Sequence, residues 1–352
     1  MQDRSVTPDA LLVVGFGGPE GPDEVLPFLR RVTAGRGIPD ERLVEVGAHY
    51  EHFGGVSPIN EFHRRLLRDL TPSVQQRWPG TAVYWANRNS EPYLPDVVEQ
   101  MTRDGVSAPV ALVTSAYSSY SGCRQYRENL ETARRLVSGS PPIPKVRPYF
   151  DHPALVDLWE ELIAADVAAI GGDPASTLIL FSTHSIPTAA AHRAGPGGTD
   201  AYERQHQELG EVLLGRLRER FGSALSGDLC YQSRSGPPSQ PWLEPDVSDR
   251  LRQARAGGIT HVVLVPLGFI SDHIEVLWDL DTVALADAAQ EGLVARRTPT
   301  VGEHPAFAEA VLEILAEYFE AAPARACTRA GPTPSVCPAD CCLPAPRPAP
   351  PS

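Results

Sequence analysis

The 352-residue sequence has no excess of basic residues and no long apolar run. Lysine and arginine total 31 against 44 aspartates and glutamates, which gives a net charge of −13. A nucleic-acid partner is therefore not expected, because a phosphate polyanion requires a basic binding face. No stretch reaches the roughly 18 to 20 apolar residues of a membrane-spanning helix, and the opening residues MQDRSVTPDALLVV do not resemble a secretory signal. We expect a cytoplasmic protein without a transmembrane segment.

Cysteine is scarce and unevenly placed. Only six cysteines occur, and four of them lie in the last 26 residues. Disulfides are rare in cytoplasmic proteins, so a disulfide framework is not expected. The segment 323–352 is rich in proline and alanine and poor in larger aliphatic residues, so it cannot bury a core of its own. Either this extension is disordered, or something other than packing holds it, such as a metal centre.

Short apolar segments alternate with longer amphipathic ones along the rest of the chain. The apolar segments predict buried strands at 11–16, 82–86, 110–115, 177–183 and 261–269. The amphipathic segments predict helices at 24–33, 58–78, 95–103, 124–137, 153–170 and 200–221. This alternation is typical of parallel sheets flanked by helices. We expect an α/β protein with two Rossmann-like domains, a ligand cleft at the carboxyl ends of their strands, and a separate extension, with bounds 1–150, 151–322 and 323–352.

A histidine ends one of these predicted strands. The segment LFSTHSIP places His184 at the carboxyl end of the strand at 177–183, which is the ligand-facing position in open α/β sheets. A neutral imidazole there can accept a proton or bind a metal near neutral pH. For an isolated histidine a structural role is the better interpretation, so His184 needs a second element to become a functional candidate.

That second element is an acidic segment after the strand predicted at 261–269. In SDHIEVLWDLD a helix is expected to begin near Asp272. The spacing of Asp272, Glu275 and Asp279 places three carboxylates on one helical face. Like charges on one face destabilise a helix unless a cation neutralises them, so the row predicts a path for metal ions or protons. A solvated acidic face is the alternative interpretation.

Several loops carry aromatic and hydroxyl groups near the same expected edge of the sheets. The turn GFGGPE lacks the spacing of a dinucleotide-binding loop and places Phe16 at a strand end. Ser57, which precedes Pro58, is expected to cap a helix. Tyr120 lies in a loop rich in hydroxyl groups, and Trp242 offers a flat apolar face within a long Ser/Gly/Pro loop. Each of these residues can equally serve loop structure or packing.

Taken in order, these motifs resemble the ferrochelatase family, whose members insert Fe²⁺ into a free-base porphyrin. The resemblance spans roughly residues 8 to 320 and is carried by five segments: LLVVGFGGPE, HYEHFGGVSPIN, LFSTHSIP, YQSRSGPPSQPWLEPD and VPLGFISDHIEVLWDLD. It implies two Rossmann-like domains with the porphyrin between them. Two pyrrole N–H protons must leave while Fe²⁺ enters, so the chemistry requires a base of near-neutral pKa and an anionic partner.

The resemblance also implies roles for individual residues. His184 would face the centre of the macrocycle, where it accepts protons or delivers the metal. Glu275 would be its acidic partner across the pocket, so the two are the expected catalytic residues and ligands of the Fe²⁺ substrate. Asp279 would continue the carboxylate line. The porphyrin pocket is expected to be formed by Phe16, Arg36, Tyr50, Ser57, Tyr120, Tyr126 and Trp242.

Three positions depart from the pattern of some relatives. Phe16 stands where a tyrosine can touch the metal, so no phenol oxygen is present here. His49 stands in place of an arginine, which puts one propionate contact in doubt. Val283 stands where the carboxylate row gains another acid, so an outer metal site built from that row is also in doubt.

A branch of the family binds a [2Fe–2S] cluster through one internal cysteine and three cysteines of a C-terminal extension. By this resemblance the ligands would be Cys123, Cys327, Cys337 and Cys342. Cys341 would be a substitute for Cys342, because adjacent cysteines can hardly both reach a cluster without strain. On ligand count alone, four thiolates suit zinc equally well.

The GFGGPE and CRQYREN segments and the tail are similar to actinobacterial members of the family. This similarity implies coproporphyrin III as the porphyrin and coproheme as the product in haem biosynthesis, and it suggests contact with neighbouring enzymes of that pathway. Protoporphyrin IX, which would give protohaem, is the alternative substrate. Two other interpretations remain open: a chelatase that inserts cobalt or nickel into a related tetrapyrrole, and a non-catalytic porphyrin or haem carrier in which His184 is an axial ligand.

Overall fold

Two parallel sheets form the framework of the protein. A computed structural model describes residues 7–35, 37–236 and 239–345. The strand order is β2–β1–β3 in the first sheet and β5–β4–β6–β7 in the second. Their bounds are β1 (Ala10–Gly15), β2 (Ala82–Asn87), β3 (Pro109–Val113), β4 (Thr177–His184), β5 (Ser226–Gln232), β6 (His261–Val265) and β7 (Val294–Arg297). Each pairing of these strands is parallel, as the alternation of strands and helices predicts.

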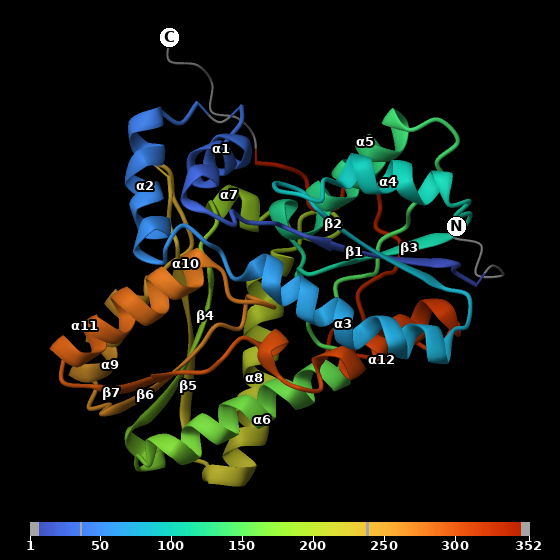
Figure 1. Ribbon diagram of the computed structural model, residues 1–352. Coiled ribbons are helices and arrows are strands. Elements are labelled where there is room, and N and C mark those ends of the chain that lie inside the picture. The colour runs from blue at the N-terminus through green and yellow to red at the C-terminus, as the bar shows by residue number, and fades with distance from the viewer. Residues whose placement is uncertain (1–6, 36, 237–238, 346–352) are drawn as a thin grey trace.

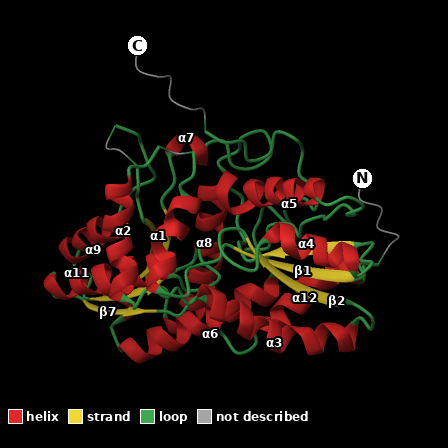
Figure 2. Cartoon of the chain, turned by 45° about the horizontal axis from the view of Figure 1, so that its top comes forward, coloured by secondary structure: helices red, strands yellow, loops and turns green. Residues whose placement is uncertain are grey.

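Helices connect the strands and cover both sheets (Figures 1 and 2). In the first half they are α1 (Pro22–Val32), α2 (Asp40–His52), α3 (Ile59–Arg77), α4 (Leu94–Arg103), the π-helix η1 (Tyr120–Arg124) and α5 (Gln125–Leu136). In the second they are α6 (Pro153–Ile170), η2 (Pro174–Ser176), α7 (Thr188–Ala191), α8 (Ala201–Phe221), α9 (Val247–Ala256), α10 (Ile274–Val276), the π-helix η3 (Leu277–Ala284), α11 (Leu285–Gln290), η4 (Val301–Glu303) and α12 (Phe307–Phe319). No described helix combines the length and the apolar character that crossing a membrane requires.

The side chains of β1 alternate between two apolar cores. Leu11 and Val13 pack in a core with α3 and α12, whereas Leu12 and Val14 pack in another with α4 and α5. Figure 1 shows these two pairs of helices on opposite sides of the strand. A strand buried on both faces has a continuous apolar sequence, which is why this strand is predictable.

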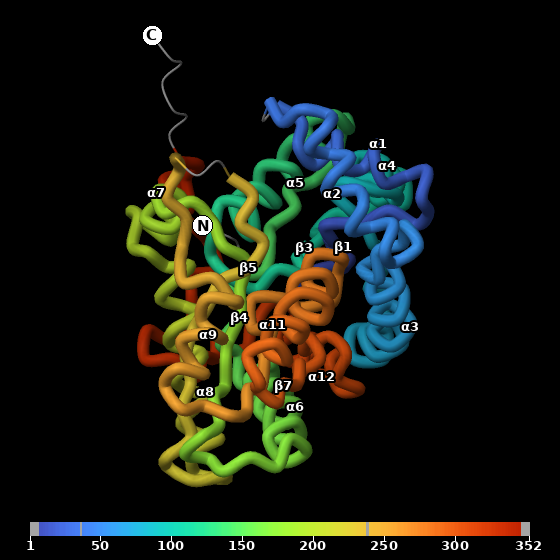
Figure 3. The backbone as a smooth tube through the Cα atoms, turned by 90° about the vertical axis from the view of Figure 1, so that its left-hand side faces the viewer, coloured from blue at the N-terminus to red at the C-terminus, as the bar shows by residue number. Residues whose placement is uncertain are grey.

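One of these cores continues into the second sheet. Ile179 and Phe181 of β4 belong to the core that holds α3 and α12, while Leu178 and Leu180 face α9 and α11. The last helix, α12, follows the second sheet in the chain but packs on α3 of the first half. Figure 3 shows α1 to α4 gathered on the right and α8 and α9 on the left. The expected division near residue 150 stays a prediction, because the core is continuous between the halves.

Some elements differ from the sequence-based expectations. The strand predicted at 261–269 ends at Val265, where the chain turns and the amide of Leu267 donates to the carbonyl of Val265 over 2.8 Å. The helix expected near Asp272 begins at Ile274 and becomes a π-helix at Leu277. The short edge strand β7 was not predicted. Its residues are at most half buried, and its sequence is not continuously apolar.

Candidate active site

His184 and Glu275 meet at the carboxyl ends of two neighbouring strands. His184 is the last residue of β4, and Glu275 lies in α10, which follows β6. Because β4 and β6 are paired, the end of one strand lies beside the helix that follows the other. Nε2 of His184 is 3.6 Å from Oε2 of Glu275, and the two side chains are 33% and 49% exposed. The structure therefore brings the two predicted catalytic residues together.

The distance between His184 and Glu275 contradicts the prediction that the two residues face each other across the pocket. A macrocycle between the two groups would need about 7 Å, because each face requires a van der Waals contact of about 3.5 Å. At 3.6 Å the imidazole and the carboxylate touch directly, so they do not oppose each other across a pocket. The two groups lie side by side because β4 and β6 are neighbouring strands.

The pair stabilises its own charged form. Desolvation opposes a charged imidazole, yet the nearby negative charge of Glu275 raises the pKa of His184 above its ordinary value. Desolvation likewise opposes the carboxylate, but His184 lowers the pKa of Glu275 to about 2. Nδ1 of His184 donates to the carbonyl of Ser185, which leaves Nε2 as the ring nitrogen that faces Glu275.

Asp279 lies on the same side, beyond Glu275. Glu275 of α10 and Asp279 of η3 are four residues apart along consecutive helical turns, a spacing that places two side chains on one face. The hydroxyl of Ser233 donates to Oδ2 of Asp279, and Nε2 of Gln232 lies 3.5 Å from the same oxygen. Burial, together with the charge on Glu275, raises the pKa of Asp279 to about 6. This carboxyl can therefore gain or lose a proton near neutral pH.

Asp272 does not join the row of carboxylates, and the prediction of three stacked acids is wrong. Asp272 precedes α10, so it does not share the helical face. Both of its carboxylate oxygens accept hydrogen bonds from Arg297 of β7 at 3.0 Å, and Nε of Arg297 donates to Asp281 at 2.6 Å. This partly buried guanidinium pairs with Asp272 and Asp281, and the row consists of Glu275 and Asp279.

Two histidines near the pair are missing from the sequence-based prediction. The charges of His273 and His49 act, after that of His184, to lower the pKa of Glu275. His49 of α2 stacks on Trp278, with ring centroids 4.1 Å apart and an angle of 10° between the rings. Burial lowers the pKa of both histidines. The motif SDHIE contains His273 beside the predicted acid, so it could have been included. His49 was singled out only as the replacement of an arginine near a propionate, and the fold places it against Trp278.

The predicted porphyrin-binding residues divide into exposed and buried members. Phe16 is partly exposed at the end of β1 and joins a cluster that includes Tyr50 and Ile274, the residue before Glu275. Trp242 is also partly exposed and pairs with Pro187, three residues after His184. These contacts place both aromatic residues near the ion pair.

The buried members lie behind this surface. Tyr50, Ser57 and Tyr126 are 8%, 4% and 3% exposed. Ser57 makes no side-chain cap to α3, contrary to expectation, and its amide instead donates to the carbonyl of Pro19 at 2.9 Å. Their contact with a porphyrin stays a prediction, and Arg36 lies outside the described residues.

Arg88 connects the aromatic residues of the first half. Its guanidinium lies 5.6 Å from the ring centroid of Phe16 and 4.5 Å from that of Tyr126. It also donates to the carbonyl of Ser121 at 3.3 Å, next to Tyr120. Arg88 follows β2, where the sequence shows no motif, so the residue was not predictable from the chain alone.

The described part of the C-terminal extension is held by buried polar groups. Arg147 and Glu317 form an ion pair of 2.7 Å that is almost fully buried, and Arg147 also donates to the carbonyl of Arg325 at 2.6 Å. Asp151 accepts from the hydroxyl of Thr328 at 2.5 Å. Of the two expectations for this segment, anchoring by something other than apolar packing is the one observed.

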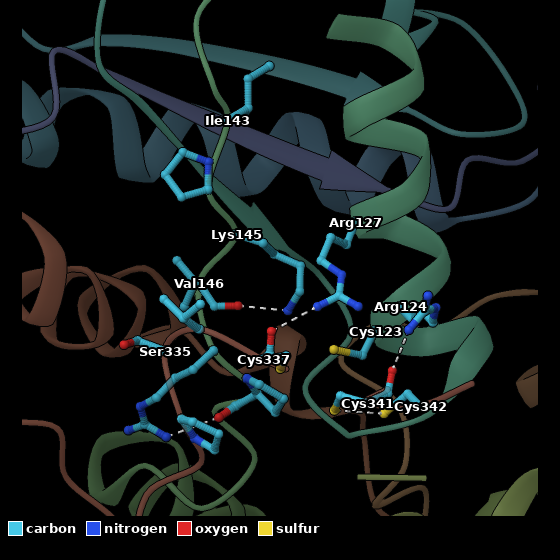
Figure 4. Close-up of a pocket in the computed structure, with 15 residues that line it drawn as sticks. Cys123, Arg124, Arg127, Ile143, Lys145, Val146, Ser335, Cys337, Cys341 and Cys342 are labelled. Atoms are coloured by element: carbon cyan, nitrogen blue, oxygen red, sulfur yellow. Dashed lines mark hydrogen bonds between the residues drawn. The ribbon is translucent and has the colours of Figure 1, made fainter. Parts of the chain in front are cut away.

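Cys123, Cys337, Cys341 and Cys342 line a common cavity of about 310 Å³ (Figure 4). Cys327, which was expected to join them, is absent from this lining and instead accepts a hydrogen bond from Arg216 at 3.7 Å. Within residues 7–35, 37–236 and 239–345, no three His, Cys, Asp or Glu side chains are arranged as a metal-ion site. The four thiols are thus a set of donors around one cavity rather than a formed ligand cage.

Comparisons with known proteins agree with this architecture. The solved structure of SirB from Bacillus subtilis with Fe³⁺ matches 88% of this chain and 94% of its own, with a TM-score of 0.50 and 12% identity. The two-sheet arrangement is therefore a chelatase-type α/β fold.

Sequence comparison identifies the family within that fold. The family described as Ferrochelatase matches residues 8–318. The coproporphyrin III ferrochelatase of Streptomyces griseus is 48% identical over 356 residues, which cover 97% of this chain and 95% of the relative. That of Frankia alni is 47% identical over 344 residues, with 96% and 87% covered, and the ferrochelatase of Rhodopirellula baltica is 42% identical over 342 residues, with 96% and 94% covered. The chain belongs to the ferrochelatase family.

Proposed function

We propose that this protein inserts Fe²⁺ into coproporphyrin III and releases coproheme for haem biosynthesis. The names of the Streptomyces and Frankia relatives favour coproporphyrin III over protoporphyrin IX. The observation that carries the proposal is the ion pair of His184 and Glu275 at the strand ends, with the protonatable Asp279 beside it. A non-catalytic carrier has no need of such a chain of proton-exchanging groups.

The charges of the pair suggest how metal entry and proton loss are coupled. The charge on Glu275 favours the protonated form of His184 against the desolvation that opposes it. When Fe²⁺, the substrate, approaches Glu275, its positive charge cancels that stabilisation, and His184 loses its proton more readily. The neutral imidazole can then accept a proton from a pyrrole N–H. Asp279, with a pKa of about 6, can take protons onward to solvent.

We assign ring contacts to the partly exposed Phe16, Tyr120 and Trp242. The buried members of the predicted set support this wall from behind. Residues 1–150 and 151–322 are proposed as the two domains that enclose the porphyrin. This arrangement would place the macrocycle against the exposed sides of His184 and Glu275.

The test is anaerobic Fe²⁺ insertion into coproporphyrin III and protoporphyrin IX, followed by absorbance. We expect faster insertion into coproporphyrin III, and about a 100-fold lower kcat for His184→Ala with porphyrin affinity within about twofold of wild type. His192→Ala, which removes an exposed histidine after the same strand, is the control. Unchanged turnover in His184→Ala would remove that residue from the mechanism. A protein that binds porphyrin without turnover would be a carrier, and insertion only of cobalt or nickel would indicate a different chelatase.

We also propose that the cysteine cavity binds a [2Fe–2S] cluster. Cys123, Cys337, Cys341 and Cys342 line one cavity, and four cysteine thiolates are the ligand set that holds such a cluster. When bound, such a cluster supplies a one-electron redox centre. The expected observation is a reddish-brown protein that absorbs visible light without added porphyrin. A colourless protein with stoichiometric zinc would contradict the cluster and support the alternative metal.

A further inference from the structure

The four cysteines of the cavity come from distant parts of the chain. Cys123 lies in the π-helix η1, whereas Cys337, Cys341 and Cys342 lie in the extension. π-Helical turns are rare and occur frequently at functional sites. In Figure 4 the four side chains lie around one space beneath α5. No carboxylate belongs to the residues that line this space.

Cys341 and Cys342 point to the same side of the chain although they are adjacent. Their sulfur atoms are 3.6 Å apart. Cys342 has a φ of 54°, in the left-handed region that residues other than glycine rarely adopt. In an extended chain adjacent side chains point to opposite sides, so the unusual φ is what allows both thiols to reach one cavity. Such backbone conformations carry strain and cluster at functional sites.

Hydrogen bonds fix the segment that carries these two thiols. The amide of Gly195 donates to the sulfur of Cys342 at 3.2 Å. Arg124 donates to the carbonyls of Ala339 and Cys341 at 2.6 and 3.0 Å, as Figure 4 shows in part. An N–H group aimed at sulfur stabilises a thiolate and is one of the features that set the properties of iron–sulfur centres.

Positive charge surrounds the cavity. Arg124, Arg127 and Lys145 are among its lining residues, and Lys145 is the only lysine of the chain. The ammonium group of Lys145 donates to the carbonyl of Val146 at 2.7 Å and faces the sulfur of Cys123. An oxidised [2Fe–2S] centre with four thiolate ligands carries a net charge of 2−, so these cations offset the charge that ligation would bring.

Cys327 occupies a different environment. Arg216, its hydrogen-bond donor, is paired with Asp157 at 2.7 Å and Glu160 at 3.0 Å. The amide of Cys327 donates to the carbonyl of Asp151 at 2.8 Å, which fixes the backbone there. A thiol with acidic groups nearby and a fixed backbone is poorly suited to join a centre built elsewhere.

Resting on the proposed cluster, we propose that its four ligands are Cys123, Cys337, Cys341 and Cys342, and that Cys327 is not a ligand. Both adjacent cysteines contribute, in contrast to the expectation from sequence that only one of them would. On assembly, two ferric ions and two sulfide ions join the four thiolates, and the four thiol protons go to solvent.

The experiment compares two matched variants of the full chain, Cys341→Ser and Cys327→Ser, after anaerobic reconstitution with iron and sulfide. We expect Cys341→Ser to lose about 90% or more of the acid-labile sulfide and of the visible absorption. Cys327→Ser should retain both at wild-type levels. Sulfide is the decisive quantity, because Fe²⁺ bound at the porphyrin site contributes iron but no sulfide.

The possible outcomes show whether an error lies in the choice of ligands or in the identity of the metal. Loss of the centre in Cys327→Ser and its retention in Cys341→Ser would overturn the assignment. Stoichiometric zinc without sulfide in wild type would refute the [2Fe–2S] proposal, yet loss of that zinc only in Cys341→Ser would support the same four ligands. A wild-type chain that takes up neither iron with sulfide nor zinc would overturn both proposals.

A measurement on the unaltered protein covers the case in which Cys341→Ser does not fold. Thiol alkylation followed by mass spectrometry should label Cys327 of the loaded protein and leave Cys341 protected. After the metal is removed with a chelator, Cys341 should become labelled. Labelling of Cys341 at equal rates before and after chelation would contradict its role as a ligand.

Discussion

Replacement of Asp279 by asparagine should change the pH dependence of iron insertion. The pKa of about 6 means that the carboxylate fraction of Asp279 falls roughly tenfold, from about 0.9 at pH 7 to about 0.1 at pH 5. The raised pKa of His184 means that its neutral form also becomes scarcer as the pH falls. If both groups must be deprotonated to accept protons, log kcat/KM of the wild type should fall at low pH with a slope of about 2.

In Asp279→Asn only His184 remains to titrate, so the slope should be about 1. At pH 7 the variant should be about tenfold slower, because the onward proton acceptor is missing. Anaerobic insertion rates measured from pH 5 to 8 give both quantities. Asp287→Asn is the matched control, since it removes a carboxylate from α11 without touching Ser233. Identical slopes in Asp279→Asn and the wild type would refute the proton relay.

Three further predictions concern affinity and stability. Arg88→Ala should weaken porphyrin binding about fivefold in a fluorescence titration. The reason is the loss of two cation–π contacts, to Phe16 and Tyr126, of roughly 0.5–1 kcal/mol each. Unchanged affinity would show that Arg88 does not order the pocket wall. Burial raises the pKa of the fully buried Asp151 from 3.8 to about 6, so its contribution to the free energy of unfolding is complete below pH 4 and falls by about 3 kcal/mol as the pH rises through 6. Asp151→Asn should remove that fall in denaturant melts, and an unaltered pH dependence would contradict it. In Gly268→Ala the new Cβ would lie 2.0 Å from Oγ1 of Thr183. This clash should lower the free energy of unfolding by about 1–3 kcal/mol, measured as a lower thermal midpoint. A thermal midpoint equal to that of the wild type would show that β4 adjusts freely.

The parts of the fold that follow from continuous apolar sequence could be predicted from the chain. Strands β1 and β4 are buried on both faces, so their side chains are apolar at successive positions. The histidine at the end of β4 could be placed for the same reason. Glu275 could be paired with it only through the resemblance to the ferrochelatase family, because the pairing of β4 with β6 is visible only in the structure.

The remainder depends on contacts between distant residues or on local backbone conformation. Asp272 precedes α10 and is bound by Arg297, which lies 25 residues later in the chain. His49 reaches the site only because α2 lies beside Trp278. The joint approach of Cys341 and Cys342 depends on one unusual φ angle, which composition and spacing do not reveal.

The extension touches both halves of the protein at the cysteine cavity. Arg124 of the first half binds the carbonyl of Cys341, and Gly195, in the loop that follows β4 and α7, binds the sulfur of Cys342. The two anchors belong to segments that move independently once the chain unfolds. Whatever occupies the cavity therefore adds its binding free energy to the resistance of the folded enzyme against separation of its halves. Heat or denaturant should release that occupant in the same transition that dismantles the porphyrin site.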